Sequence, residues 1–322
     1  MFRSPGKIAL IPLTAALLLP FLSGLAQDPK TSTASGTASA ALTTEKAMAL
    51  AQQGRCKEAL PTLRRAASGS GPADKRKQAG VLGLKCAMGM DDRASATELL
   101  LQLHKQFPQD PDILFISVHA YSDLSSRTAL DLGRLAPKSV PARELNAEAL
   151  EMQGKWDEAQ REYDDILQTD PTTKGVHYLL GRLMLSKPGG DATSLAAAKQ
   201  EFQKELEIDA KNAGAEYILG EMARQESQWD EAIAHFSRAA KLDTSFGDAY
   251  MGWGFCLVTV KRYEEAIPPL EMAVRLQEGN PGAHYNLAVA LSRTGKKEEA
   301  EKEFAIHRQL TQKSPPGEEK KE

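Results

Sequence analysis

A short motif that recurs along the chain is the feature that most limits what the chain can fold into. Each copy has five residues and closes with Glu-Ala, and the copies lie at 55–59, 155–159, 228–232, 262–266 and 296–300. In the last three copies the closing residues Ala232, Ala266 and Ala300 are 34 residues apart. Gly220 and Gly254 each lie 12 residues before the closing alanine of their copy, so a second mark keeps the same register. A period of about 20–50 residues is typical of a solenoid or repeat array.

The composition favours closely packed helices. The chain contains 46 Ala and 39 Leu among 322 residues, while aromatic residues make up only 6%; Ala and Leu are strong helix formers. Charged residues make up 26% and the formal net charge is −3, which excludes a disordered polyelectrolyte and a basic nucleic-acid-binding protein. Length alone would suggest about two domains. The repeat instead predicts one all-α solenoid over residues 40–313.

The residues around the motif resemble the tetratricopeptide repeat family, whose 34-residue units form a helix, a turn and a second helix. Unit 213–246 carries Gly220 at position 8, Ala232 at position 20, Phe236 at position 24 and Ala239 at position 27. Small residues at positions 8, 20 and 27 allow two helices to approach at the short end of the usual range of about 8–10 Å between axes. The resemblance implies a right-handed superhelical solenoid of about eight helix–turn–helix units.

The expected units differ in how well they match the pattern. The match is strong from residue 140 to 305 and weaker upstream. One unit carries five extra residues, which we place around 188–191 between its two helices, and another has only 29 residues, so we expect its second helix to be shortened. The expected units are 40–76, 77–110, 111–139, 140–173, 174–212, 213–246, 247–280 and 281–313.

The two ends of the chain are expected to lie outside the solenoid. Residues 1–26 carry two positive charges, a mostly apolar run and small residues before Gln27, which is the pattern of a cleaved secretory signal peptide. The apolar run is shorter than the roughly 20 residues that span a bilayer, which favours a cleaved signal; an uncleaved membrane anchor is the alternative. Residues 27–39 resemble a flexible linker and 314–322 a polar tail. We expect an exported protein, periplasmic or extracellular, with no transmembrane segment after signal removal.

The three cysteines match no zinc, haem or CxxC redox spacing. The repeat register places Cys56 at the start of the second helix of the first unit and Cys86 late in the following helix. Because these helices are expected to be antiparallel, both residues lie far from the turn and at a similar level. An oxidising compartment then favours a disulfide between them, with two free thiols as the alternative. Cys256 is expected to be a buried thiol.

The sequence contains no recognisable catalytic or metal-binding constellation. The six histidines form no HExxH pattern, and GxSxG, P-loop, Rossmann glycine and EF-hand patterns are absent. His177 and His284 share position 4 of their units, so we interpret them as packing residues. We therefore expect no enzymatic activity, no catalytic residue, no metal and no cofactor.

The resemblance implies that the first helices line a concave groove through positions 2, 5, 9, 12 and 13. Here these positions hold mainly aromatic, apolar and arginine side chains, and aromatic and arginine side chains are favoured at binding hot spots. The Lys and Asn with which some family members grip a carboxylate are absent, so an extended or helical segment with apolar anchors is the better expectation. Alternatively, the tyrosines at position 5 only pack locally. The predicted groove residues are Tyr178, Arg182, Tyr217, Glu221, Arg224, Met251, Phe255, Tyr285 and Val289.

Together these features predict a non-catalytic scaffold of the cell envelope or periplasm that binds a protein or peptide segment in its groove. One alternative is an accessory subunit for export or transfer of an envelope polysaccharide or glycan, acting beside a separate catalytic chain. Another is a glycan-binding solenoid in which Tyr178, Tyr217 and Tyr285 stack on sugars. We expect no nucleic-acid partner, and the sequence leaves the oligomeric state open.

Overall fold

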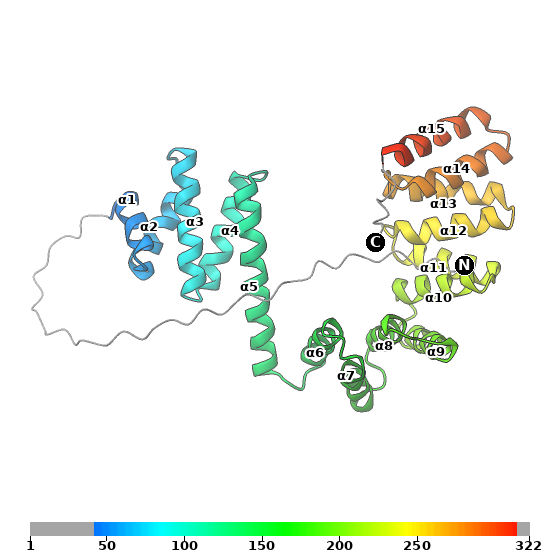
Figure 1. The fold of residues 1–322 in the computed structure, drawn as a ribbon, viewed down its shortest axis with the longest axis horizontal. Coiled ribbons are helices and arrows are strands. Elements are labelled where there is room, and N and C mark those ends of the chain that lie inside the picture. Colours follow the sequence, from blue (N-terminus) through cyan, green and yellow to red (C-terminus); the bar gives the residue numbers. More distant parts are fainter. Residues whose placement is uncertain (1–41, 314–322) are drawn as a thin grey trace, which may run out of the picture. The chain divides into compact units, whose positions relative to one another are not determined.

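The computed structural model describes residues 42–313, which form α-helices joined by short turns with no β-strand in that range (Figure 1). The predicted signal peptide, linker and tail, at 1–26, 27–39 and 314–322, lie outside the described residues. The chain divides into two compact units, one up to Leu114 and one from Phe115 onward. None of the described helices is both long and apolar enough to cross a lipid bilayer.

The helices form pairs of sequence neighbours that pack against each other, as the helix–turn–helix repeat predicts. The first unit contains α1 (Thr44–Gln52), α2 (Cys56–Ser68), α3 (Ala73–Gly89) and α4 (Arg93–Gln106). Helix α5 (Pro111–Leu135) spans the boundary between the units. The second unit continues with α6 (Val140–Met152), α7 (Trp156–Thr169), α8 (Val176–Ser186), α9 (Ala192–Ile208), α10 (Ala213–Gln225), α11 (Trp229–Leu242), α12 (Gly247–Thr259), α13 (Tyr263–Leu276), α14 (Pro281–Arg293) and α15 (Lys297–Lys313). The predicted all-α repeat fold is confirmed.

Glycines at position 8 of the first helix leave room for an aromatic ring from the second helix of the same pair. A Cβ atom added to Gly181 would lie 2.9 Å from the ring of Phe202, and one added to Gly220 would lie 2.9 Å from the ring of Phe236. Both rings are fully buried. Because real Cβ atoms do not approach other atoms so closely, only glycine leaves room for these rings. The alanines that close the five motif copies are also buried, as is Ala198 at the same repeat position: Ala59, Ala159, Ala232, Ala266 and Ala300.

The turn inside most pairs repeats one backbone geometry. In the pair α10–α11, Ser227 has a positive φ of 59°, and the next residue, Gln228, donates its N–H to the carbonyl of Ala223 at 2.8 Å. This hydrogen bond and the left-handed residue form a Schellman motif, which ends a helix. Five other pairs have a positive φ at the same repeat position, at Gly54, Asp91, Gly154, Lys261 and Gly295.

The residue at position 4 of the first helix makes a polar side-chain contact with the residue at position 23 of the second helix in several pairs. In α8–α9, His177 Nδ1 lies 2.6 Å from Glu201 Oε2, and both side chains are buried. In α14–α15, His284 Nδ1 lies 2.6 Å from Glu303 Oε2, and its Nε2 contacts the carbonyl of Glu278 at 3.0 Å. The interpretation of His177 and His284 as packing residues is therefore confirmed.

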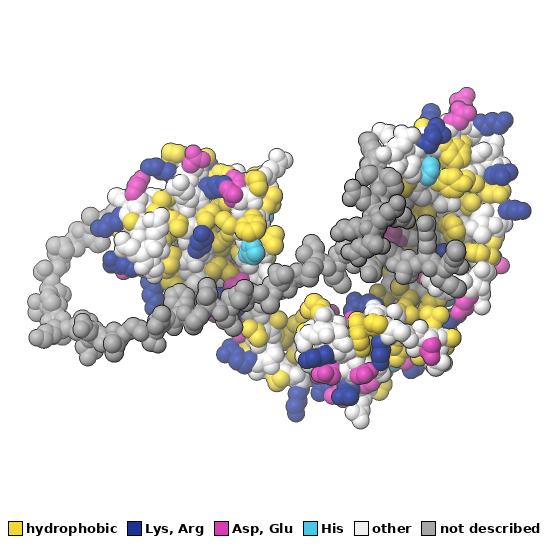
Figure 2. Space-filling model, viewed as in Figure 1, with side chains coloured by type: hydrophobic (Ala, Val, Ile, Leu, Met, Phe, Trp, Pro, Cys, Tyr) yellow, Lys and Arg dark blue, Asp and Glu magenta, His cyan; other side chains and the backbone are white. Residues whose placement is uncertain are grey.

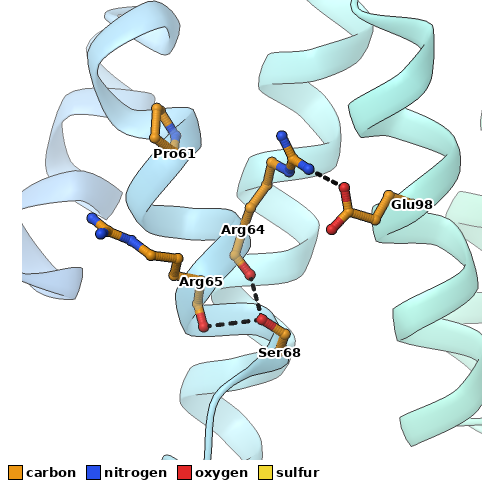
Figure 3. Close-up of a pocket in the computed structure, with 5 residues that line it drawn as sticks. All are labelled: Pro61, Arg64, Arg65, Ser68 and Glu98. Carbon is orange, nitrogen blue, oxygen red and sulfur yellow. Dashed lines mark hydrogen bonds and ion pairs between the residues drawn. The ribbon is translucent and has the colours of Figure 1, made fainter.

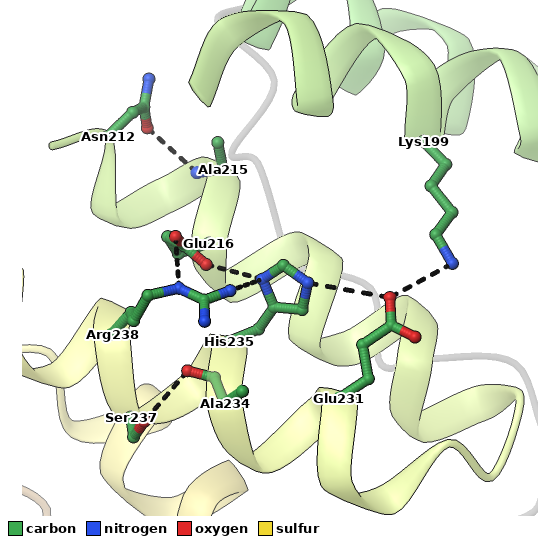
Figure 4. A network of polar contacts seen from close by, with 9 residues as sticks. All are labelled: Lys199, Asn212, Ala215, Glu216, Glu231, Ala234, His235, Ser237 and Arg238. Atoms are coloured by element: carbon green, nitrogen blue, oxygen red, sulfur yellow. Dashed lines mark hydrogen bonds and ion pairs between the residues drawn. The ribbon is translucent and has the colours of Figure 1, made fainter. Parts of the chain in front are cut away.

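The pair α10–α11 reverses this arrangement and carries the carboxylate on its first helix (Figure 4). The oxygens of Glu216, a residue only 5% exposed, lie 2.6 Å from His235 Nδ1 and 2.7 Å from Arg238 Nε. Burial raises the pKa of Glu216, but hydrogen bonds from His235 and Arg238 outweigh it and hold the pKa below its ordinary value. Glu231 connects this network to α9, because its Oε1 lies 3.8 Å from His235 Nε2 and 3.7 Å from Lys199 Nζ.

The repeat at 111–139 differs from the sequence-based expectation. A shortened second helix is expected there, but α5 runs without interruption from Pro111 to Leu135. No glycine or proline stands in the middle of this segment, and Pro137 is the first residue that disfavours helical geometry in the residue before it. With no second helix in the repeat, large apolar side chains on α5 stay exposed, including Phe115, Val118 and Leu130.

The insertion expected around 188–191 does lie between the two helices of its repeat. Residues 187–191 connect α8 to α9, and Asp191 caps α9 by accepting the N–H of Ser194 at 2.9 Å. Part of the extra length also extends the second helix, because α9 has 17 residues where α11 and α13 have 14.

Two of the three cysteines connect successive pairs in the first unit. Cys56, the first residue of α2, and Cys86, near the end of α3, are joined by a disulfide with their Cα atoms 5.0 Å apart. The bond therefore links the second helix of one pair to the first helix of the next. Cys256 is a buried free thiol, and burial raises its pKa to about 12. A thiol with so high a pKa is a poor nucleophile at neutral pH.

Candidate functional site

Five of the predicted groove residues line one pocket in the second unit. The pocket has a volume of about 280 Å³ and is lined by Tyr217, Glu221, Arg224, Asp248, Met251, Gly252 and Phe255. These residues are spaced three and four apart on α10 and again on α12, so each set lies on one face of its helix. The repeat register thus places side chains from two successive units around one hollow.

The guanidinium of Arg224 is held by groups from both helices. It donates to Glu221 through Nη2, 2.6 Å from Oε2, and through Nε, 3.2 Å from both carboxylate oxygens. Its central carbon lies 5.8 Å from the centre of the Phe255 ring, within the range of a cation–π interaction. The hydrogen bonds from Arg224 to Glu221 raise the pKa of the guanidinium. Its positive charge is therefore neutralised within the pocket.

Asp248 adds a second carboxylate at the start of α12. Its Oδ1 accepts a hydrogen bond from Gln277 Nε2 at 2.7 Å. Burial raises the pKa of Tyr217 to about 12, and the charges of Glu221 and Asp248 act in the same direction. Two carboxylates against one guanidinium give the pocket lining a net negative charge, beside an apolar wall from α12.

The predicted groove residues on α8 do not line this pocket. The ring of Tyr178 packs edge-on against Phe202, with ring centres 5.8 Å apart. Arg182 lies beside α6, where its Nη2 is 3.7 Å from Glu151 Oε2. Glu151 also accepts a hydrogen bond from the hydroxyl of Tyr163 at 2.9 Å. Both predicted residues are therefore engaged with neighbouring helices.

The predicted groove residues on α14 also lie outside the pocket. Tyr285 is 47% exposed and packs edge-on against Phe304, with ring centres 6.0 Å apart, and lies 5.3 Å from the ring of His307. Val289 is half-buried. Hydrophobic side chains reach the surface among charged ones in both units (Figure 2).

A family model described as tetratricopeptide repeat matches residues 257–315. This part of the chain is therefore a tetratricopeptide repeat segment. Among curated proteins, human superkiller complex protein 3 is 31% identical over 119 residues, which cover 35% of this chain. The match spans only 7% of the length of that human protein.

Among solved structures, this repeat protein is similar to MamA and YrrB. A crystal structure of MamA is 24% identical, covers 52% of this chain and 95% of that chain, and has a TM-score of 0.45. The crystal structure of YrrB is described as a TPR protein with an unusual peptide-binding site. It is 20% identical, covers 57% of this chain and 92% of the YrrB chain, and has a TM-score of 0.47.

Two residues of the pocket were not predicted by name. Asp248 stands at position 2 of its repeat, one of the groove positions, so the register alone points to it. Gly252 has no such signal. A Cβ atom at Gly252 would lie 2.8 Å from the ring of Phe236 on α11, so this glycine allows α12 to pack closely against the preceding pair.

A second hollow lies in the first unit, where the sequence predicts no site (Figure 3). It has a volume of about 350 Å³ and is lined by Pro61, Arg64, Arg65, Ser68 and Glu98. Arg64 donates to Glu98 across α2 and α4, and the Ser68 hydroxyl donates to the carbonyls of Arg64 and Arg65. The polar groups thus mainly bind one another. Across 42–313, no group of His, Cys, Asp or Glu side chains is placed to hold a metal ion.

Proposed function

We propose that this repeat protein is a non-catalytic scaffold that holds a segment of a partner protein on the pocket between α10 and α12. Helical repeats of this kind are typical of protein–protein interaction scaffolds. The observation that carries the proposal is the convergence of groove side chains from two successive repeats on one pocket. Its volume of about 280 Å³ lies just below the range of about 300–1,000 Å³ for small-molecule sites, which suits one or two side chains of a longer segment.

The packing of the groove tyrosines favours a protein segment over a glycan. Tyr178 packs against Phe202, and Tyr217 lies 5.7 Å from the ring of Phe236 and 4.8 Å from that of Phe246. These contacts take up ring surface that a sugar would need for stacking. Tyr285, which is 47% exposed, is the most exposed of the three tyrosines.

We also propose that the protein acts outside the cytoplasm, in the cell envelope or beyond it. The signal-like pattern at 1–26 and the pair Cys56–Cys86 support this, since disulfides persist in oxidising compartments. Mass spectrometry of the protein from fractionated native cells is expected to find a chain that begins at Gln27 outside the cytoplasm. An intact Met1 in the cytoplasmic fraction would contradict this location.

Site-specific crosslinking tests the scaffold proposal. A photoreactive amino acid at Met251, in the pocket, is expected to crosslink to a defined partner in native cells. The same group at Leu276, which is 38% exposed at the end of α13, is the matched control. The product at position 251 should disappear when Phe255→Ala removes the apolar wall, while the thermal unfolding curve shows that the variant is folded. Equal crosslinking from both positions, or no effect of Phe255→Ala, would refute the assignment of the pocket.

A further inference from the structure

We infer that the α10–α12 pocket selects a partner segment that presents a lysine or arginine side chain next to an apolar one. This inference rests on the proposed function and adds the chemistry of the partner. Of the three charged groups lining the pocket, Glu221 and Asp248 are negative and only Arg224 is positive. A cationic side chain therefore complements the pocket, and an anionic one meets repulsion.

The single arginine does not turn the pocket into an anion site. Arg224 reaches Glu221 through two of its nitrogens and covers one face of the Phe255 ring. An incoming carboxylate would have to displace Glu221, which keeps its negative charge in the same hollow. The exchange would replace one ion pair by another and leave a second carboxylate unpaired. The protein thus carries its own anion where a ligand's anion would have to bind.

Asp248 provides the acceptor for an incoming cation. Gln277 occupies Oδ1, whereas Oδ2 has no hydrogen-bond partner among the described residues. Asp248 is exposed, so a ligand reaches it without any rearrangement of the helices. The negative charges of Glu221 and Asp248 help to raise the pKa of Tyr217, a sign that the potential inside the pocket is negative.

The walls of the pocket suit the methylene stem of such a side chain. Met251, Phe255 and Tyr217 are each half-buried and line the same hollow as the carboxylates. Lysine and arginine lay their stems along apolar surface while the charged head stays at a polar rim. A neighbouring apolar residue of the segment gains the remaining apolar surface. The pocket therefore combines an acidic rim with an apolar wall, and a basic side chain satisfies both.

The net negative charge of the whole second unit also favours a basic partner segment, at longer range than the pocket contacts. Residues 115–313 contain 24 Lys and Arg against 31 Asp and Glu, a net charge of −7. A field of one sign raises the rate at which oppositely charged segments arrive, and salt weakens this effect. Binding of a basic segment should therefore weaken as the salt concentration rises.

A displayed library of random 12-residue peptides tests the inference without a known partner. The full chain is used for selection, and its Phe255→Ala variant is used to remove peptides that bind elsewhere. We expect the retained peptides to be enriched in Lys or Arg beside an apolar residue. Retained peptides enriched in Asp or Glu would overturn the inference and leave the proposed function intact. If no peptide depends on Phe255, the proposed function fails as well.

Synthetic versions of one retained peptide then isolate the charge. Three peptides carry lysine, norleucine or glutamate at the enriched position; norleucine keeps the stem without the ammonium group. The Asp248→Asn variant should bind the lysine peptide about two- to fivefold more weakly and the norleucine peptide unchanged. Asp230→Asn, which removes an equal charge at a residue whose side chain is 95% exposed on α11, is the control and should leave both affinities unchanged.

A double variant provides the reverse test. Glu221→Gln with Asp248→Asn removes both carboxylates and leaves Arg224 without its partner, so the preference should change from the lysine to the glutamate peptide. Circular dichroism verifies that each variant is folded. Equal binding of the lysine and norleucine peptides to the unchanged protein, or an unchanged preference in the double variant, would overturn the inference.

Discussion

The two compact units use the same repeat but reinforce it differently. Residues 42–114 carry 11 basic and 8 acidic residues, a net charge of +3, whereas residues 115–313 have a net charge of −7. In the first unit a disulfide joins successive pairs. In the second, rings fill the space beside two position 8 glycines, Gly181 and Gly220, while Gly254 faces Leu270. Buried carboxylates there bind histidine or arginine.

The size of the core side chains explains this contrast. Gly80 and Gly83 on α3 face the aliphatic residues Leu103 and Leu99, whereas Gly220 on α10 faces the ring of Phe236. A small core of aliphatic residues buries less apolar area, and small cores often need a covalent link. The comparison teaches that the repeat fixes the backbone spacing, while stability comes from whatever fills the space between the helices.

The largest expected effect is loss of the disulfide. Replacing Cys56 and Cys86 by serine should lower the stability of the first unit by about 3 kcal/mol, because the bond closes a loop of 30 residues. All three tryptophans lie in the second unit, at 156, 229 and 253. Urea unfolding should therefore shift when followed by circular dichroism and stay unchanged when followed by tryptophan fluorescence. An equal shift in both signals would contradict the contrast between the units. As a control, reductant should leave the unfolding curve of the serine variant unchanged, because it has no disulfide to reduce.

The next largest effect is expected from replacing two helical glycines, one packed against a ring and one with open space beside it. Gly220→Ala should destabilise the second unit by about 2 kcal/mol, because the new methyl group meets the buried ring of Phe236. Gly133→Ala on α5 is the matched control, since nothing lies within 4 Å of its Cβ position. It should stabilise α5 by about 0.5–1 kcal/mol through helix propensity. Urea unfolding measures both, and a loss of stability in both variants would contradict the packing explanation.

The buried carboxylate of Glu216 makes the second unit sensitive to acid. Its folded-state pKa is lowered, so its ion pairs contribute stability above the unfolded pKa of about 4.3 and lose it as the pH falls through the folded pKa. Glu216→Gln should cost about 1.5 kcal/mol at pH 7 and less below pH 4. Unfolding followed by tryptophan fluorescence across pH 3–7 measures this difference. A cost that is independent of pH would show that the carboxylate charge contributes nothing.

The smallest effect concerns the turns, which both units share. Lys261→Gly should stabilise the protein by about 0.5–1 kcal/mol, because φ at Lys261 is positive and glycine adopts this conformation without steric cost. Gly295→Ala, at the same repeat position, should destabilise it by a similar amount. Thermal unfolding provides the measurement. Changes of the same sign in both variants would rule out backbone strain as the cause.

Much of the second unit follows from the sequence because its marks are local and periodic. The spacing of Gly220, Ala232 and Phe236 predicts two helices with one close approach, and the structure has that contact. The carboxylates at Glu216 and Glu303 resemble ordinary surface acids in the sequence, because their histidine partners lie 19 residues away. The pocket is predictable only in part. Repeat positions 5, 9 and 12 point to its lining residues, but the place of Gly252 depends on its close contact with Phe236 of the preceding pair.

The sequence by itself determines the helical repeat, its period and the residues that face a groove, because a residue's place on a helix depends only on its number within the repeat. Tertiary structure decides which of those residues meet. Tyr217 and Phe255 come together only when α12 packs against the preceding pair, whereas Tyr178, which packs on Phe202 much as Tyr217 packs on Phe236, does not line the pocket. It also decides that 111–135 is one helix, since a turn forms only where the end of a helix is stabilised more than its continuation.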